Sequence, residues 1–180
     1  MAGFWTKVDA FDARAEARIE PFRNRFWLNE LFYGASFLGD HGLIWIVLAV
    51  LRYFTGVGGS EAAHFAGIRS VVAEAGQALF VNVGVKSLFR RKRPVLQFDR
   101  PYHLRIPRTT SFPSGHATAS FTGAVLLSEG TPWGWFLFPL AFLIAFSRIY
   151  VRIHHASDVV GGIVIGTLVG LAIRVLVPLP

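Results

Sequence analysis

Residues 130–147 read GTPWGWFLFPLAFLIAFS, a run of 18 residues without a charged side chain. A second apolar run, VVGGIVIGTLVGLAI, follows at residues 159–173. A helix needs roughly 20 residues to cross a hydrocarbon core about 30 Å thick. Both runs therefore predict membrane helices.

The composition of the whole chain agrees with a membrane protein. Hydrophobic residues make up 53% of the 180 residues and charged residues 16%, whereas soluble domains carry roughly 25% charged residues. The mean hydropathy is +0.46. A small soluble globule could not hide that much apolar surface, and a disordered chain would be less hydrophobic. The sequence has no Cys, which excludes disulfides, thiolate nucleophiles and Cys-based zinc sites.

Three further apolar stretches occupy residues 31–53, 62–85 and 114–128. Gly39 and Asp40 interrupt the first, which is either a short interfacial helix followed by a span from about Gly42 or a reversal between two crossings. The second stretch contains two charged residues, Arg69 and Glu74, which lower its hydropathy. We therefore predict an all-α fold, a multi-pass transmembrane helical bundle of five or six membrane helices.

The N-terminal segment has a different pattern. Apolar residues recur there at three- and four-residue spacing, with charges between them: Val8, Phe11, Ala15, Ile19, Phe22 and Phe26. This predicts an amphipathic helix over residues 1–27, either lying in the membrane interface or packed on its own domain. Pro21 should kink or divide it. We find no apolar core of the signal-peptide kind and expect no cleaved leader. Residues 1–180 form a single predicted domain.

The polar residues gather at the ends of the predicted helices. If successive helices alternate in direction, the end of the second, the start of the third, the end of the fourth and the start of the fifth meet at one membrane face. The residues at these ends are Lys86, Arg93, Pro113, Ser114, Gly115, His116, Ser147, Arg148, His154 and Asp158. We therefore expect them to form one pocket.

The residue types of this pocket fit an anion. Its three fixed cations are Lys86, Arg93 and Arg148. Such side chains suit the oxygens of a phosphoryl group. Ser114 is the expected N-cap of the third helix, which leaves the amides of Gly115 and His116 free to bind an anion.

Two histidines and a carboxylate add reactivity. His154 and Asp158 are four residues apart and share one helical face. The carboxylate can fix the tautomer of His154 and leave its other nitrogen as a nucleophile. His116 on the opposite wall can protonate a leaving oxygen. The sequence lacks the clustered acids of a magnesium site, so we predict phosphoryl transfer without a metal or other cofactor.

The net charge of +7 points to an anionic partner, either phosphate groups or anionic lipid. Eight of the 18 Lys and Arg residues lie in residues 86–108. Within this segment we predict that Arg90, Arg91 and Lys92 form a solvated loop that binds lipid headgroups. The high pI alone suggests a nucleic-acid binder, but the apolar bulk of the chain argues against nucleic acid as a partner.

The motifs resemble those of the type 2 phosphatidic acid phosphatase superfamily, which also includes vanadium haloperoxidases. The three family motifs are Lys, six residues and Arg-Pro; then Pro-Ser-Gly-His; then Ser-Arg, five residues, His, three residues and Asp. Here they read KSLFRRKRP at 86–94, PSGH at 113–116 and SRIYVRIHHASD at 147–158. The match covers residues 86–158, with no departure inside the motifs.

The resemblance implies a role for each motif residue. His154 is the nucleophile, Asp158 its orienting partner and His116 the general acid. The phosphate-binding residues are Lys86, Arg93, Ser114, Gly115 and Arg148. We interpret His155 as a neighbour that lines the site.

The expected function is that of an integral membrane lipid phosphatase acting through a phosphohistidine. The resemblance implies a polyprenyl diphosphate or phosphate, phosphatidic acid or phosphatidylglycerol phosphate as substrate, or alternatively a polyprenyl-linked sugar phosphate. A vanadium haloperoxidase would be soluble and far longer. A noncatalytic lipid-binding scaffold does not explain the two histidines and Asp158. The sequence leaves the membrane side of the site and the oligomeric state open.

Overall fold

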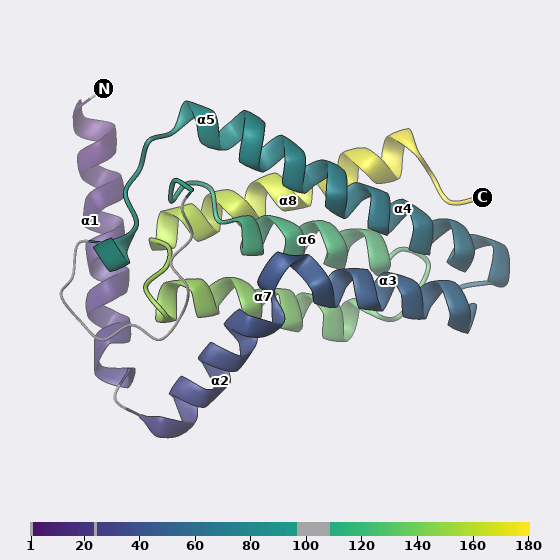
Figure 1. Ribbon diagram of the computed structural model, residues 1–180, viewed down its shortest axis with the longest axis horizontal. Helices are drawn as coiled ribbons and strands as arrows, with labels where there is room; N and C mark the ends of the chain where they lie inside the picture. The colour runs from purple at the N-terminus through teal and green to yellow at the C-terminus, as the bar shows by residue number, and fades with distance from the viewer. Residues whose placement is uncertain (1, 24, 97–108) are drawn as a thin grey trace.

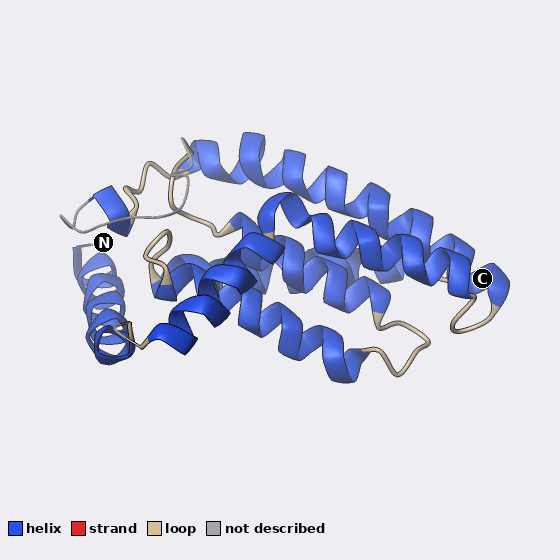
Figure 2. Cartoon of the chain, turned by 60° about the horizontal axis from the view of Figure 1, so that its bottom comes forward, coloured by secondary structure: helices blue, strands red, loops and turns tan. Residues whose placement is uncertain are grey.

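The computed structural model describes residues 2–23, 25–96 and 109–180, and these ranges form helices and loops without a strand (Figures 1 and 2). The predicted all-α fold is confirmed. The helices are α1 (Ala2–Ile19), α2 (Phe26–Leu38), α3 (Leu43–Thr55), α4 (Ser60–Leu79), α5 (Lys86–Leu88), α6 (Gly115–Leu127), α7 (Gly134–Tyr150) and α8 (Ala156–Leu176). A π-helical segment, Phe80–Val85, joins α4 to α5.

The long helices α3, α4, α6, α7 and α8 run beside one another, and α1 stands across one end of them (Figure 1). Helix α6 packs against α3, α4, α7 and α8, and all its residues from Ala117 to Leu127 are buried. The core therefore surrounds α6. At the C-terminal end of this helix, the buried Arg52 donates hydrogen bonds to the carbonyls of Leu126 and Leu127, at 3.3 and 2.9 Å.

The predicted breaks occur where the sequence places them. Helix α1 ends at Ile19, and a 3-10 turn, Glu20–Phe22, carries Pro21. A second 3-10 turn, Asp40–Gly42, separates α2 from α3, which meet at a bend of 51°. Gly42 has φ +68°, a left-handed conformation that glycine adopts without strain. The bend deflects the chain and does not turn it back, so α2 and α3 are not a hairpin.

In the described part of the chain, one helix is long and apolar enough to cross a membrane by itself. This is α8, with a mean hydropathy of 2.3 over its best 18-residue window. The bent pair α2–α3 passes the same test as one unit, and α7 is apolar but shorter. The predicted number of five or six membrane helices stays a prediction.

Glycines bring α8 into close contact with α6. A Cβ on Gly162 would lie 2.6 Å from the carbonyl oxygen of Ser114, and one on Gly170 would lie 2.8 Å from Cβ of Val125. Between them, Gly166 faces the backbone of Thr118. Small residues at this spacing let membrane helices approach closely. Glycines spaced four apart on α8 therefore allow its close packing against α6.

We predict that Gly166→Ala destabilises the protein by about 1–3 kcal/mol, because the added methyl group has no room against the backbone of α6. Gly76→Ala on α4 is the matched control, since nothing lies within 4 Å of its Cβ position. It should leave stability equal or slightly higher, because alanine favours the helix. Unfolding of both variants in detergent measures the difference, and equal stability of the two would contradict the close packing.

Candidate functional site

A cavity of about 900 Å³ opens where the ends of several helices meet. Six of the predicted site residues line it: Lys86, Arg93, Gly115, His116, Arg148 and His154. Four further residues expected in this pocket are buried and do not line it: Pro113, Ser114, Ser147 and Asp158. The predicted convergence of the helix ends on one pocket is therefore observed.

His154 lies in the turn between α7 and α8, and its Nε2 is 3.0 Å from Nη1 of Arg93. A guanidinium group only donates, so Nε2 accepts and its lone pair faces the cations. The proton then belongs on Nδ1, which is 3.7 Å from Oδ2 of Asp158. Burial above all, and then Arg93 and Arg148, lower the pKa of His154 to about 3 against the opposing effect of Asp158. The imidazole is therefore neutral at pH 7, as a nucleophile requires.

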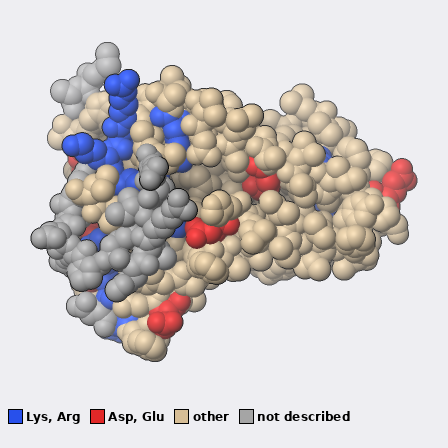
Figure 3. Space-filling view, in the orientation of Figure 1, with Lys and Arg blue, Asp and Glu red and all other residues tan. Residues whose placement is uncertain are grey.

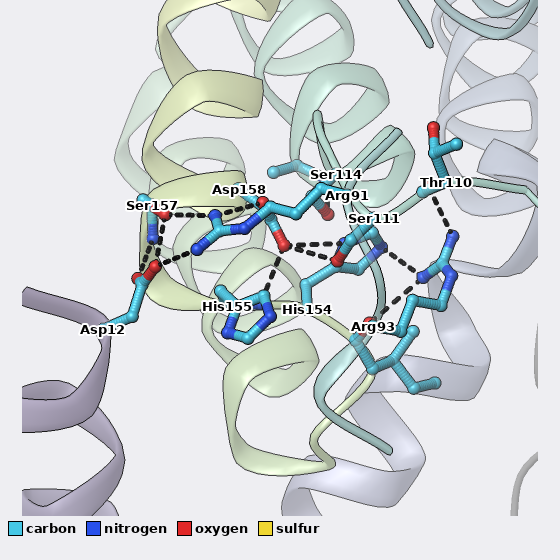
Figure 4. A network of polar contacts seen from close by, with 12 residues as sticks. Asp12, Arg91, Arg93, Thr110, Ser111, Ser114, His154, His155, Ser157 and Asp158 are labelled. Atoms are coloured by element: carbon cyan, nitrogen blue, oxygen red, sulfur yellow. Dashed lines mark hydrogen bonds and ion pairs between the residues drawn. The ribbon is translucent and has the colours of Figure 1, made fainter. Parts of the chain in front are cut away.

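Asp158 is held on several sides (Figure 4). Its carboxylate accepts hydrogen bonds from Oγ of Ser111 at 2.5 Å, from Nη1 of Arg91 at 2.8 Å and from the backbone N–H of His155 at 2.9 Å. Three donors of this kind stabilise the charged form of a buried carboxylate. Asp158 is thus a fixed negative charge behind His154.

Arg91 connects this carboxylate to α1. Its Nη2 donates to Oδ2 of Asp12 at 2.5 Å, and Asp12 also accepts from the backbone N–H and Oγ of Ser157 at 2.8 and 2.7 Å (Figure 4). The N-terminal helix therefore contacts the start of α8, directly beside Asp158.

The prediction of a solvated Arg91 is wrong. Burial alone would lower the pKa of Arg91, but Asp158 and Asp12 raise it above its usual value. The two carboxylates stabilise a guanidinium group that would otherwise stay in water. Arg90 and Lys92 are exposed, as predicted. The remaining cations of the predicted basic loop, Arg100, Arg105 and Arg108, lie outside the described residues.

Arg93 is fixed by the loop that precedes α6. It donates to the backbone carbonyls of Thr109, Thr110 and Ile153 at 3.0, 3.1 and 3.1 Å. Planar donors arranged in this way keep their orientation without a ligand. Arg93 is therefore preorganised at the edge of the cavity, next to Nε2 of His154.

Lys86 and Arg148 complete the cationic end of the cavity. Nζ of Lys86 donates to Oδ1 of Asn82 at 2.9 Å and to Oγ1 of Thr109 at 3.3 Å. Burial above all, and then the charges of Arg93 and Arg148, lower the pKa of Lys86 to about 8. Arg148 donates to Oγ of Ser36 on α2. Positive groups that repel one another at close range favour the binding of an anion between them.

The start of α6 forms the opposite wall. Ser114 is the N-cap, as predicted: its Oγ accepts from the backbone N–H of Ala117 at 3.4 Å. Ser114 therefore caps the start of α6 without lining the cavity. A Cβ on Gly115 would lie 3.8 Å from Nζ of Lys86, so the backbone of this turn borders the cations.

His116 has a carboxylate partner that sequence reasoning missed. Its Nε2 lies 2.9 Å from Oδ1 of Asp40, in the turn between α2 and α3. A Cβ on Gly39 would lie 2.9 Å from Cδ2 of His116, so the glycine makes room for the ring. Gly39 and Asp40 interrupt an apolar stretch, and that interruption was the available signal. The second imidazole of the cavity is thus also paired with an acid.

His155 does not line the cavity, and the prediction that it does is wrong. Its Nε2 is 3.2 Å from the carbonyl oxygen of Lys92, and His155 is the N-cap residue of α8. The backbone turns between His154 and His155, so the two rings point to different sides (Figure 4).

The arrangement can transfer a phosphoryl group. A neutral imidazole stands beside a fixed carboxylate, a second imidazole lines the same cavity, and three cations line it as well. Positioning and charge stabilisation are most of what phosphoryl transfer asks of a protein. Among residues 2–23, 25–96 and 109–180, no group of three or more His, Asp or Glu side chains is placed to hold a metal ion.

Comparisons with known proteins point in the same direction. The sequence model of the PAP2 superfamily matches residues 67–179. The chain is 33% identical over 144 residues to the decaprenylphosphoryl-5-phosphoribose phosphatase of Mycobacterium tuberculosis, covering 76% of this chain and 73% of that protein. It is 40% identical over 86 residues to the undecaprenyl-diphosphatase of Sulfolobus acidocaldarius, covering 46% and 41%.

Two crystal structures have a similar fold. The transmembrane PAP2 type phosphatidylglycerolphosphate phosphatase from Bacillus subtilis aligns with a TM-score of 0.67 at 20% identity, covering 97% of this chain and 94% of that one. LpxE of Aquifex aeolicus aligns with a TM-score of 0.63 at 26% identity, covering 83% and 86%.

We predict that Arg91→Gln lowers kcat for release of phosphate from a phosphomonoester on the order of 100-fold, because Asp158 loses a donor and shifts relative to His154. KM should change little, since Arg91 does not line the cavity. Asp12→Asn should reproduce part of the loss. The exposed Arg90→Gln is the matched control and should retain full turnover. Equal effects at Arg90 and Arg91 would contradict this assignment.

A second prediction concerns pH. Lys86 is charged below a pKa of about 8 and neutral above it, so kcat/KM should fall as the pH rises through about 8. This ratio reports groups of the free enzyme. Lys86→Arg keeps the charge at high pH and should remove this decline. A pH profile of both proteins gives the measurement, and an unchanged decline in Lys86→Arg would assign it to another group.

Proposed function

The chain belongs to the PAP2 superfamily, and from this premise we propose that it hydrolyses lipid phosphates through a phosphohistidine on His154. The protein is a lipid phosphatase, a hydrolase of phosphate or diphosphate monoesters. The observation that carries the proposal is the neutral His154, held between Asp158 and Arg93 with its Nε2 facing a cationic cavity.

In the proposed mechanism, the phosphate of the substrate lies among Lys86, Arg93 and Arg148, at the start of α6. Nε2 of His154 attacks phosphorus and the bond to the lipid oxygen breaks. His116 gives a proton to that oxygen; burial and Arg148 disfavour its charged form, which Asp40 and the bound phosphate would stabilise. Water then attacks phosphorus, His116 takes its proton and the phosphorus–nitrogen bond breaks. Asp158 stabilises the positive charge that His154 acquires.

We further propose that the protein is an integral, multi-pass protein of a bacterial cell membrane, with five or six membrane helices. Large apolar side chains are exposed on the long helices, among them Trp135 at 89% and Leu176 at 77%. Lys and Arg side chains gather at the end of the molecule where α1 lies (Figure 3). Lipid around the apolar surface, with the basic end at the headgroups, explains this division. The helix α1 then lies along the interface.

The names of the relatives suggest two kinds of substrate. One is a polyprenyl diphosphate, the substrate class in the name of the Sulfolobus relative, and the other is a polyprenyl-linked sugar phosphate, as in the name of the mycobacterial one. Phosphatidic acid and phosphatidylglycerol phosphate are the glycerolipid alternatives.

Phosphate release from all four classes, with protein purified in detergent, tests the function. We expect release from at least one lipid, undiminished in excess EDTA and inhibited by vanadate, which mimics five-coordinate phosphorus. The His154→Ala variant is the blank. Failure to cleave any lipid phosphate would overturn the proposed function, and activity that depends on added magnesium would overturn the mechanism.

The covalent step gives a separate prediction. Rapid quenching at a pH that preserves phosphohistidine should trap label from a radiolabelled lipid phosphate on the wild-type protein and none on His154→Ala. With a nitrophenyl phosphate, whose leaving group needs little protonation, His116→Ala should accumulate the phosphoenzyme, because the water that clears it has lost its base. Asp158→Asn should slow labelling on the order of 10²–10⁴-fold. Label that persists in His154→Ala would show another nucleophile.

A further inference from the structure

The cavity extends well beyond the phosphate site. It is about 900 Å³ in volume, near the upper end of the range for pockets that hold whole small ligands. From Lys86 it follows one face of α4 and the π-helical segment. The α4 residues along this face are Val71, Glu74, Ala75, Gln77 and Ala78. The cations thus occupy one end of a longer space.

Glu74 is a buried acidic residue in the part of the cavity that lies away from the cations. Its side chain is 5% exposed, and its Oε2 accepts a hydrogen bond from Nε2 of Gln77 at 3.0 Å. Its Oε1 is buried, and no described residue is its hydrogen-bond partner. A buried carboxyl oxygen without a partner is costly. An ionisable group buried inside a membrane helix, as α4 is in the proposed arrangement, is a candidate for a functional role.

Packing alone does not explain Glu74. Arg69, on the same helix, pairs with Glu129 and donates to the carbonyl of Val177 at 2.7 Å. Glu74 has no ion-pair partner among the described residues. It lines the cavity instead, so its missing partner can come from a ligand.

The position of Glu74 relative to the phosphate follows from the contacts of Gly42. The point where a Cβ on Gly42 would lie is 3.6 Å from Oε2 of Glu74 and 3.7 Å from Cβ of Ala119. Ala119 follows His116 by three residues, about one turn of α6. Glu74 therefore lies beside the turn of α6 that follows His116, where the part of a substrate next to the phosphate can reach it.

We propose that Glu74 and Gln77 bind hydroxyl groups on the unit that carries the scissile phosphate, so that the natural substrate is the phosphate of a lipid-linked sugar or glycerol. This rests on the proposed function. A hydroxyl donates to Oε1 of Glu74 and accepts from the amide of Gln77, whose second N–H is not used by Glu74. A bare prenyl chain offers no donor. A second phosphate of a diphosphate would meet a carboxyl group at this place, away from the cations.

The test uses two lipids that differ by one hydroxyl. Lysophosphatidic acid carries a free C2 hydroxyl next to its phosphate, and its 2-deoxy analogue has hydrogen there. We expect kcat/KM of the wild type to be at least about tenfold higher for the hydroxylated lipid. Glu74→Leu should reduce this ratio to near one. Glu74→Gln, which keeps an acceptor oxygen, should retain part of the preference.

Glu61→Gln is the matched control, since Glu61 is an exposed acid on the same helix outside the cavity. A ratio that does not change in Glu74→Leu, or an equal loss on both lipids, would overturn the inference. If Glu74→Leu does not fold, the ratio measured with Glu74→Gln decides. Wild-type protein that cleaves neither these two lipids nor any member of the panel above would overturn the proposed function itself, which is a different result.

Discussion

The carboxylate of Asp158 has no exposed surface, so its charge has to be met by donors within the protein. Ser111 supplies one from the segment before α6, Arg91 another from the segment after α5, and the backbone of His155 a third. Arg91 in turn reaches Asp12 on α1. One buried charge therefore ties together segments that are far apart in sequence, and it leaves His154 oriented toward the cavity.

The close contact of α6 with α8 brings the two reactive helix starts together. Because glycines on α8 allow the helices to touch, the backbone N–H of Ser114 can donate to the carbonyl of Asp158 at 3.0 Å. His116 follows one of these residues by two positions, and His154 precedes the other by four. The separation of the two imidazoles is thus set by backbone contacts in the bundle, which are stiffer than contacts between long side chains.

Three features could be predicted from the sequence: the helical fold, the N-cap at Ser114 and the convergence of the motif residues. Each depends on a local pattern, namely the spacing of apolar residues or the residue types at a helix end. Arg91 could not, since a basic run reads the same whether its members are solvated or paired, and its carboxylates lie 79 and 67 residues away. The pairing of Asp40 with His116 could not be predicted either, because in the sequence Asp40 only interrupts an apolar stretch. The number of membrane spans is also hard to predict from the sequence. Arg69 and Glu74 lower the mean hydropathy of α4, although both side chains are buried in the folded protein.

Arg69 and Glu74 also show why substrate choice is not written in the motifs. Both are charged residues in the same apolar stretch, yet Arg69 forms an ion pair with Glu129, whereas Glu74 has no ion-pair partner among the described residues and lines the cavity. In the proposed mechanism the cations of the motifs bind a phosphate by its charge, which any lipid phosphate carries. Discrimination has to come from groups that contact the next part of the substrate. In this cavity the proposed groups, Glu74 and Gln77, belong to α4 and lie outside the motifs, so that a change there would alter the preferred lipid and leave the phosphate chemistry intact.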